Sequence, residues 1–152
     1  MEYVKEISEK IIFINQILDE IKVAHLFENS SFIIDEISME SWVKINLNNK
    51  GKNKISASFT LTLTGIEVRL DRIGEAIDWS NKDLIDSKEV IKKLLKNLLT
   101  NYILVEYYGP SLTYISLFGD NGKCNNIFKY IEGFPFKWKR QSKLYLPIVN
   151  KE

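Results

Sequence analysis

The fold is decided by residues 55–70, which read ISASFTLTLTGIEVRL. Up to Leu63 the apolar residues take odd numbers, with hydroxylic residues between them, and after Gly65 they take even numbers. A strand that alternates in this way has one buried face and one wet face. The change of phase predicts an antiparallel hairpin that turns at Thr64 and Gly65, with Leu63 opposite Ile66. A bulge is the alternative, because Thr is not the favoured residue before a turn glycine.

Two helices are predicted on either side of this hairpin in the sequence. Residues 3–28 carry apolar side chains at spacings of three and four, from Val4 to Ile21, which is the pattern of an amphipathic helix. The pattern returns between Val90 and Leu99, after a capping residue at Asp86 or Ser87. We expect the first helix to lie on a sheet, and a short coiled coil is the alternative.

Further strands are predicted at 32–38, 42–47, 102–108, 112–118 and 144–149, whereas residues 71–86 read as irregular and polar. The order helix, strands, helix, strands shows no parallel crossover. The predicted fold class is α+β, with an antiparallel β-sheet packed by a long N-terminal helix and a second central helix. A length of 152 residues suits one domain, and no repeat or linker divides the chain. We therefore expect a single domain over residues 1–152.

The composition argues against an enzyme. Cys124 is the only cysteine and His25 the only histidine, so an intrachain disulfide and a thiolate zinc site are excluded. The sequence contains none of the common nucleotide-binding, metal-binding or hydrolase motifs. Glu67 and Asp71 flank Arg69 and are interpreted as a cross-strand charge pattern, not as a catalytic pair. We expect no catalytic residue, no metal site and no cofactor.

The N-terminus predicts neither secretion nor a membrane anchor. It has no basic region before a smooth apolar stretch. Its longest apolar run is Ile11-Ile12-Phe13-Ile14, far short of the ~18 residues that indicate a membrane span. The expected location is therefore the cytoplasm, without membrane association.

The net charge of +1 hides two regions of opposite sign. Residues 64–90 hold seven acids and four bases, a net charge of −3, while residues 123–152 hold seven bases and two acids, a net charge of +5. In the acidic region a tryptophan stands among carboxylates, a composition that favours protein binding. The alternative is that Trp79 and Ile77 anchor this segment to the core while the acids are solvated. The predicted partner-binding residues are Glu75, Ile77, Asp78, Trp79, Asp83 and Asp86.

The basic region interleaves aromatic side chains with Lys and Arg, which suits stacking on single-stranded nucleic acid. Because Phe134, Phe136 and Trp138 stand at period two, the preferred interpretation is the buried face of a strand. A total of three arginines and the near-zero net charge also argue against a dedicated nucleic-acid binder. The residues for this alternative function are Lys137, Trp138, Lys139 and Arg140.

Three stretches resemble the small immunity proteins of bacterial toxin systems: 98–109 (LLTNYILVEYYG), 117–123 (LFGDNGK) and 65–79 (GIEVRLDRIGEAIDW). The resemblance implies a cytoplasmic, cofactor-free α+β protein that binds one cognate toxin and occludes its functional surface. No family motif is matched, so no site residue is carried over. Many nuclease inhibitors are strongly acidic and this chain is not, which argues against a nuclease target. We predict a non-catalytic immunity protein, and homodimerisation through the 3–28 helix or an edge strand stays open.

Overall fold

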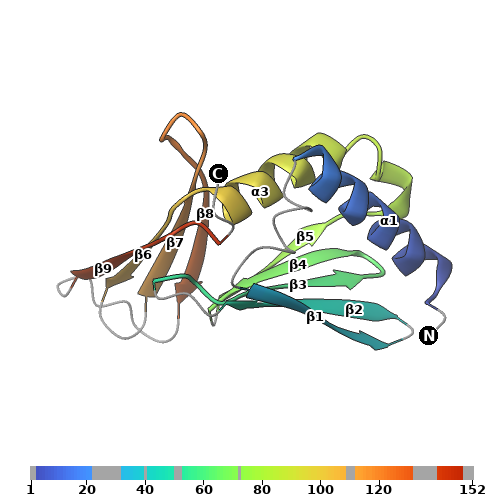
Figure 1. Cartoon of the computed structure of the whole chain (residues 1–152), viewed down its shortest axis with the longest axis horizontal. Coiled ribbons are helices and arrows are strands. Elements are labelled where there is room, and N and C mark those ends of the chain that lie inside the picture. Colours follow the sequence, from blue (N-terminus) through green and yellow to red (C-terminus); the bar gives the residue numbers. More distant parts are fainter. Residues whose placement is uncertain are drawn as a thin grey trace. The chain divides into compact units, whose positions relative to one another are not determined.

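The computed structural model describes seven stretches of the chain: residues 3–21, 32–39, 41–49, 53–71, 73–108, 112–131 and 140–148. Within them the fold class is α+β, as predicted, with two α-helices and two antiparallel sheets (Figure 1). Contacts divide the chain into two compact units, Met1–Gly51 with Ser56–Lys93, and Lys52–Ile55 with Leu94–Glu152. The single domain over residues 1–152 stays a prediction. For residues 32–39, 48, 49, 83 and 140 only the backbone is described.

The first unit is built on a five-stranded sheet in the order β1-β2-β3-β4-β5. Each strand pairs antiparallel with the next one along the chain, so the sheet is a meander (Figure 1). The strands predicted at 32–38 and 42–47 are confirmed. The strands are β1 (Phe32–Met39), β2 (Trp42–Asn49), β3 (Ala57–Thr62), β4 (Gly65–Leu70) and β5 (Ile73–Asp78).

The edge strand β5 was not predicted. It occupies part of the segment 71–86, which the sequence indicates as irregular and polar. Of its six residues only Ile73 is buried, and Gly74 to Ala76 are exposed. An edge strand with one buried residue lacks the alternation by which strands are recognised, so the prediction for this segment was wrong.

The β3–β4 hairpin has the predicted faces but turns one residue earlier. Leu61 lies opposite Ile66, so Leu63 and Thr64 form the turn, and the predicted pairing of Leu63 with Ile66 was wrong. Leu63 is 48% exposed at the turn. The predicted register differs from the observed one by two residues. Because side chains alternate with period two, all the remaining residues of the hairpin still lie on the faces predicted for them.

The turn lies one residue earlier because Gly65 belongs to strand β4 and is not a turn residue. A Cβ at this position would overlap the carbonyl oxygen of Ile77 on the neighbouring strand β5. Glycine is therefore required by the close approach of two backbones. The turn itself is held by Thr62, whose Oγ1 accepts a hydrogen bond from the Gly65 N–H at 3.1 Å.

Helix α1 (Lys5–Glu20) packs against β3 and the 3₁₀-helix η1 (Asn81–Asp83). The helix ends at Glu20 and Ile21 lies in a turn, while residues 22–28 of the predicted helix lie outside the described residues. The buried face is rotated from the predicted apolar stripe, because Ile11 and Leu18 are only half-buried. The buried residues are Ile7, Lys10, Ile14 and Ile17.

Helix α3 (Lys88–Thr100) follows a turn at residues 84–87, and the division between the two units falls inside it. Its buried apolar stripe is as predicted, except at the start of the helix. Val90 was expected in the stripe but is 66% exposed. The buried apolar side chains of the helix are Ile91, Leu94, Leu95, Leu98 and Leu99.

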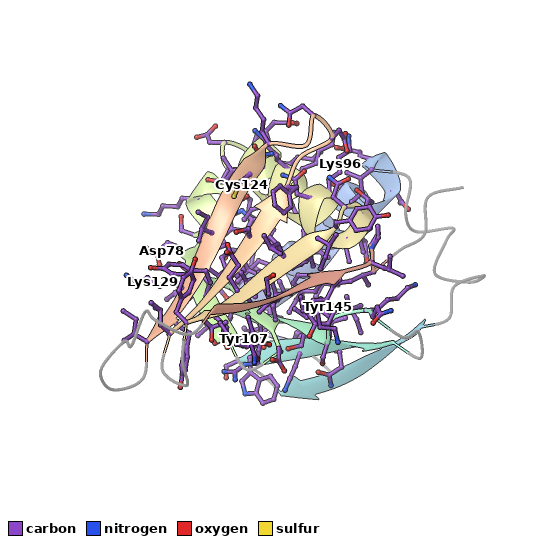
Figure 2. The ribbon with its side chains drawn as sticks, turned by 90° about the vertical axis from the view of Figure 1, so that its left-hand side faces the viewer. Asp78, Lys96, Tyr107, Cys124, Lys129 and Tyr145 are labelled. Atoms are coloured by element: carbon purple, nitrogen blue, oxygen red, sulfur yellow. The ribbon has the colours of Figure 1, made fainter. Side chains whose placement is uncertain are left out.

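The second unit contains a four-stranded antiparallel sheet in the order β8-β7-β6-β9. The predicted hairpin of 102–108 with 112–118 is confirmed by the pairing of β6 with β7. Cys124 begins β8 and is exposed (Figure 2). The strands are β6 (Ile103–Tyr108), β7 (Leu112–Phe118), β8 (Cys124–Ile131) and β9 (Arg140–Tyr145).

The closing strand β9 lies at the edge of this sheet, but earlier in the chain than the predicted 144–149. Its ladder to β6 ends at Tyr145. Leu146 then forms an isolated parallel bridge with Lys54, and Pro147 lacks the N–H that a ladder would need.

Candidate functional site

The predicted partner-binding residues lie on β5 and in the segment that joins β5 to α3. Glu75 and Asp78 are exposed on β5, and Ile77 is half-buried. Asp86 is exposed in the turn before α3, whereas the side chain of Asp83 lies outside the described part. Because β5 is the edge of the described sheet, its exposed side chains border an outer strand edge.

Trp79 lies in the core, not on this edge. Its side chain is 1% exposed, and its ring meets that of Phe13 edge to face, with 6.4 Å between centroids. Its backbone N–H donates a 2.9 Å hydrogen bond to the carbonyl oxygen of Thr64. A side chain buried this deeply offers no surface to a partner in this conformation. Trp79 therefore anchors the segment, as in the alternative interpretation, and the exposed apolar contacts must come from other residues.

Two exposed aliphatic side chains border Asp86 and Glu89 in the sequence. Ile85 is 79% exposed and Val90 is 66% exposed. Neither residue is predicted as a binding residue from the sequence, because Ile85 falls in a turn and Val90 fits the helical stripe. We call the exposed residues of this segment and of β5 the acidic edge: Glu75, Asp78, Ile85, Asp86, Glu89 and Val90.

The start of α3 is oriented by Glu20 of α1. The ammonium groups of Lys88 and Lys92 lie 2.5 Å and 3.2 Å from its two carboxylate oxygens. Hydrogen bonds from Lys88 and then from Lys92 lower the pKa of Glu20 below its ordinary 4.5. Lys88 and Lys92 share one side of the helix, and this ion pair holds that side against α1.

The acidic edge carries charge that the described structure does not neutralise. None of its four carboxylates forms an ion pair with a side chain that the structure describes. Lys88 and Lys92, two of the bases in α3, are engaged by Glu20. Between Ile85 and Val90 the chain therefore presents negative charge and exposed aliphatic side chains together, a combination that fits a basic protein surface with an apolar centre.

A buried lysine fixes the segment that leads to this edge. Lys10 is 0% exposed, and its Nζ donates hydrogen bonds to Asn81 Oδ1 at 2.9 Å and to the carbonyl oxygen of Leu63 at 3.0 Å. Asn81 Nδ2 donates in turn to Glu9 Oε2 at 2.6 Å and to the carbonyl oxygen of Glu6 at 3.1 Å. Burial lowers the pKa of Lys10, and the nearby Glu6 and Glu9 oppose this shift. The network ties η1 to α1, so the chain after β5 has a fixed path.

The alternative nucleic-acid site cannot be placed. Lys137, Trp138 and Lys139 lie outside the described residues, and Arg140 is described only as backbone at the start of β9. His25 also lies outside the described residues. These predictions stay predictions.

Among the described residues no group of three His, Cys, Asp or Glu side chains could hold a metal ion. Of the helices described, none is both long enough and apolar enough to cross a membrane. Comparisons with models of protein families, with curated proteins and with solved structures return no match.

Proposed function

We propose that this protein is a non-catalytic immunity protein that binds a cognate bacterial toxin through the acidic edge and occludes the toxin's functional surface. The observation that carries the proposal is the exposure of Ile85 and Val90 in the same short segment as Asp86 and Glu89. Exposed aliphatic side chains within a charged surround are typical of interaction surfaces. A cytoplasmic location belongs to the same proposal.

The two kinds of side chain have different roles in binding. The carboxylates attract a basic toxin surface and raise the association rate, an effect that salt weakens. Ile85 and Val90 lose their water on contact, and full burial of an aliphatic side chain of this size contributes about 1.5–3 kcal/mol. The apolar pair therefore sets how long the complex lasts, and the carboxylates set how quickly it forms.

The fixed path of the chain supports tight binding. Trp79 is buried between β5 and η1 in the sequence, and Lys10 holds η1 through Asn81. A surface that is already ordered loses little conformational entropy when a partner binds. The exposed Glu75 and Asp78 on β5 also discourage pairing with unrelated strands, which makes this edge selective.

The test uses the full chain and a candidate toxin chosen from the products of genes that neighbour its own. The two purified proteins are mixed, the complex is isolated by size-exclusion chromatography, and the activity of the toxin is titrated with the chain. We expect a stable complex and a loss of toxin activity that ends at the equivalence point. Full toxin activity in the presence of excess chain would overturn the proposal.

A further inference from the structure

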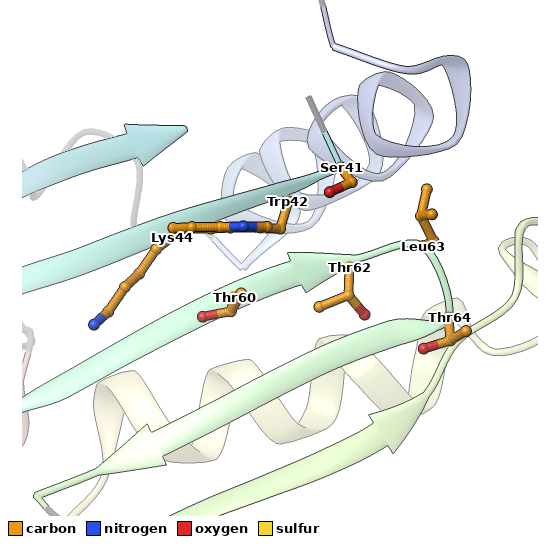
Figure 3. A pocket seen from close by; sticks show the side chains of 7 residues that line it. All are labelled: Ser41, Trp42, Lys44, Thr60, Thr62, Leu63 and Thr64. Carbon is orange, nitrogen blue, oxygen red and sulfur yellow. The ribbon is translucent and has the colours of Figure 1, made fainter. Parts of the chain in front are cut away.

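The five-stranded sheet carries an open groove of about 500 Å³ on the face that its core side chains leave free (Figure 3). Cavities of about 300–1,000 Å³ are the usual size for small-molecule sites. The groove uses the ends of β2 and β3 and the turn after β3. The residues that give it chemical character are Ser41, Trp42, Lys44, Thr60, Thr62 and Thr64.

The floor of the groove combines an aromatic ring, a cation and hydroxyl groups. Trp42 pairs with Thr62 and Lys44 pairs with Thr60 across β2 and β3, so all four side chains share one face of the sheet. Figure 3 shows the Trp42 indole edge-on, with Thr60 and Thr62 on the strand beside it. Trp42 and Lys44 are both half-buried. Both side chains therefore keep some exposed surface that a ligand can contact.

The end of the groove is held in place before any ligand binds. Thr62 Oγ1 donates to the carbonyl oxygen of Gly65 at 3.2 Å and accepts from its N–H at 3.1 Å. From the other side of the sheet, Lys10 donates to the carbonyl oxygen of Leu63 at 3.0 Å. The turn that forms the groove wall is thus fixed from two sides, which lowers the entropic cost of binding.

The charge in the groove favours an anion. Lys44 is the only charged residue among the described residues that line it. On β4 the partner of Thr60 is Glu67, whose carboxylate is paired with Arg69 at 3.3 Å. Lys44 itself forms no ion pair with a side chain that the structure describes, so its charge can attract an anionic ligand.

We propose that this groove binds a nucleotide, either free or as part of a single strand, with the base stacked on Trp42 and the phosphate on Lys44. Residues two apart on a strand are separated by about 7 Å, which suits a base and a phosphate joined through a ribose. Aromatic stacking accepts any base, and the hydroxyls of Thr60 and Ser41 are suited to hydrogen bonds with polar groups of the ligand. This site shares no residue with the acidic edge and does not depend on toxin binding.

The experiment measures binding of adenosine monophosphate, adenosine, ribose phosphate and a short oligoadenylate to the full chain by protein-observed NMR. We expect adenosine monophosphate to shift the amide signals of Trp42, Lys44 and Thr60, and to bind more tightly than adenosine or ribose phosphate. Tighter binding of oligoadenylate supports a strand as the source of the nucleotide, and equal binding supports the free nucleotide. No shift from either nucleotide at millimolar concentration overturns the proposal, as does binding of a neutral disaccharide in their place.

Variants separate the two contacts. Trp42→Ala is expected to weaken nucleotide binding about ten-fold or more, and Trp42→Phe should retain most of it, which guards against a folding defect. Lys44→Met should reduce binding of adenosine monophosphate to the level of adenosine and leave adenosine unchanged. Lys123→Met removes one positive charge from an exposed turn and should have no effect. Unchanged nucleotide binding in folded Trp42→Ala contradicts the proposal.

Discussion

The ammonium group of Lys10 and the side-chain oxygen of Asn81 are joined by a 2.9 Å hydrogen bond between α1 and η1. The same ammonium group also holds the carbonyl oxygen of Leu63, at the turn between β3 and β4. One buried charge therefore positions both the segment before the acidic edge and the wall of the groove. The two proposed surfaces have a common support in the first unit, although they share no residue.

Replacing Lys10 by Met should destabilise the protein by about 1–3 kcal/mol, because Met fills the space but leaves Asn81 Oδ1 and the Leu63 carbonyl oxygen without their donor. The free energy of unfolding in urea measures this change. Lys5→Met is the matched control on an exposed position of α1, and it should change stability by less than about 0.5 kcal/mol. A Lys10→Met variant as stable as the wild type would show that the network contributes nothing.

The contribution of Lys10 to stability should increase with pH. Desolvation by burial lowers its pKa below the ordinary value of 10.5, against the opposing charges of Glu6 and Glu9. Between the folded-state pKa and 10.5 the unfolded chain binds more protons than the folded protein, so stability rises with pH in this window. We therefore expect the difference in unfolding free energy between wild type and Lys10→Met to shift in favour of the wild type as pH approaches 10.5. A constant difference across this range would contradict the burial of the charge.

Gly65→Ala should cost about 3 kcal/mol or prevent folding, because the new Cβ would overlap the carbonyl oxygen of Ile77. Gly74→Ala on β5 is the matched control. Its Cβ would lie 3.2 Å from Glu67 Oε1, at the end of a flexible side chain that can move. We expect a change within about 1 kcal/mol for the control. Thermal unfolding measures the stability of both variants. Equal stabilities would show that β5 does not approach Gly65 closely.

Acid should remove the stabilisation that Glu20 provides. Hydrogen bonds from Lys88 and Lys92 lower its pKa below 4.5, so the ion pair contributes fully above pH 4.5. Its contribution is lost as pH falls through the folded-state pKa, where the carboxylate takes up a proton. Glu20→Gln should therefore be less stable than the wild type at neutral pH and equal to it in acid. The neighbouring exposed change Asp19→Asn should show no comparable deficit at neutral pH, and a Glu20→Gln deficit that persists unchanged in acid would contradict this pairing.

The parts of the fold that the sequence predicts depend on local periodicity. The change of phase at Gly65 predicts which residues of β3 and β4 share a face, and the stripe from Ile91 to Leu99 predicts α3. Each of these patterns is complete within a few turns or strand residues. Their boundaries and register were less accurate, because the turn at Leu63 and Thr64 is set by contacts with β5.

The remaining features depend on partners far away in the sequence. Lys10 stands three residues after Ile7, in step with the buried face, but its charge predicts the solvent side. Its burial is possible because Asn81 and Leu63, 71 and 53 residues away, supply acceptors. The acidic neighbours of Trp79 likewise indicate a position at the surface, whereas its ring packs against Phe13 of α1. Ile85 and Val90 became candidates only through their exposure, which no local pattern shows.

The acidic edge is tested by paired variants of exposed residues, which should leave folding intact. The test variant combines Asp78→Lys with Ile85→Ser, and it reverses one charge and removes one aliphatic contact of the acidic edge. The control variant combines Asp19→Lys with Ile12→Ser, which makes the same changes at exposed positions of α1. Circular dichroism is used to check that both variants fold.

The most direct measurement is the dissociation constant of the complex between each variant of the chain and a candidate toxin, chosen from the products of neighbouring genes. We expect wild type and control to bind equally tightly, and the Asp78→Lys, Ile85→Ser variant to bind at least about ten-fold more weakly. A folded test variant that binds the toxin as tightly as the wild type would contradict the assignment of the acidic edge as the binding surface.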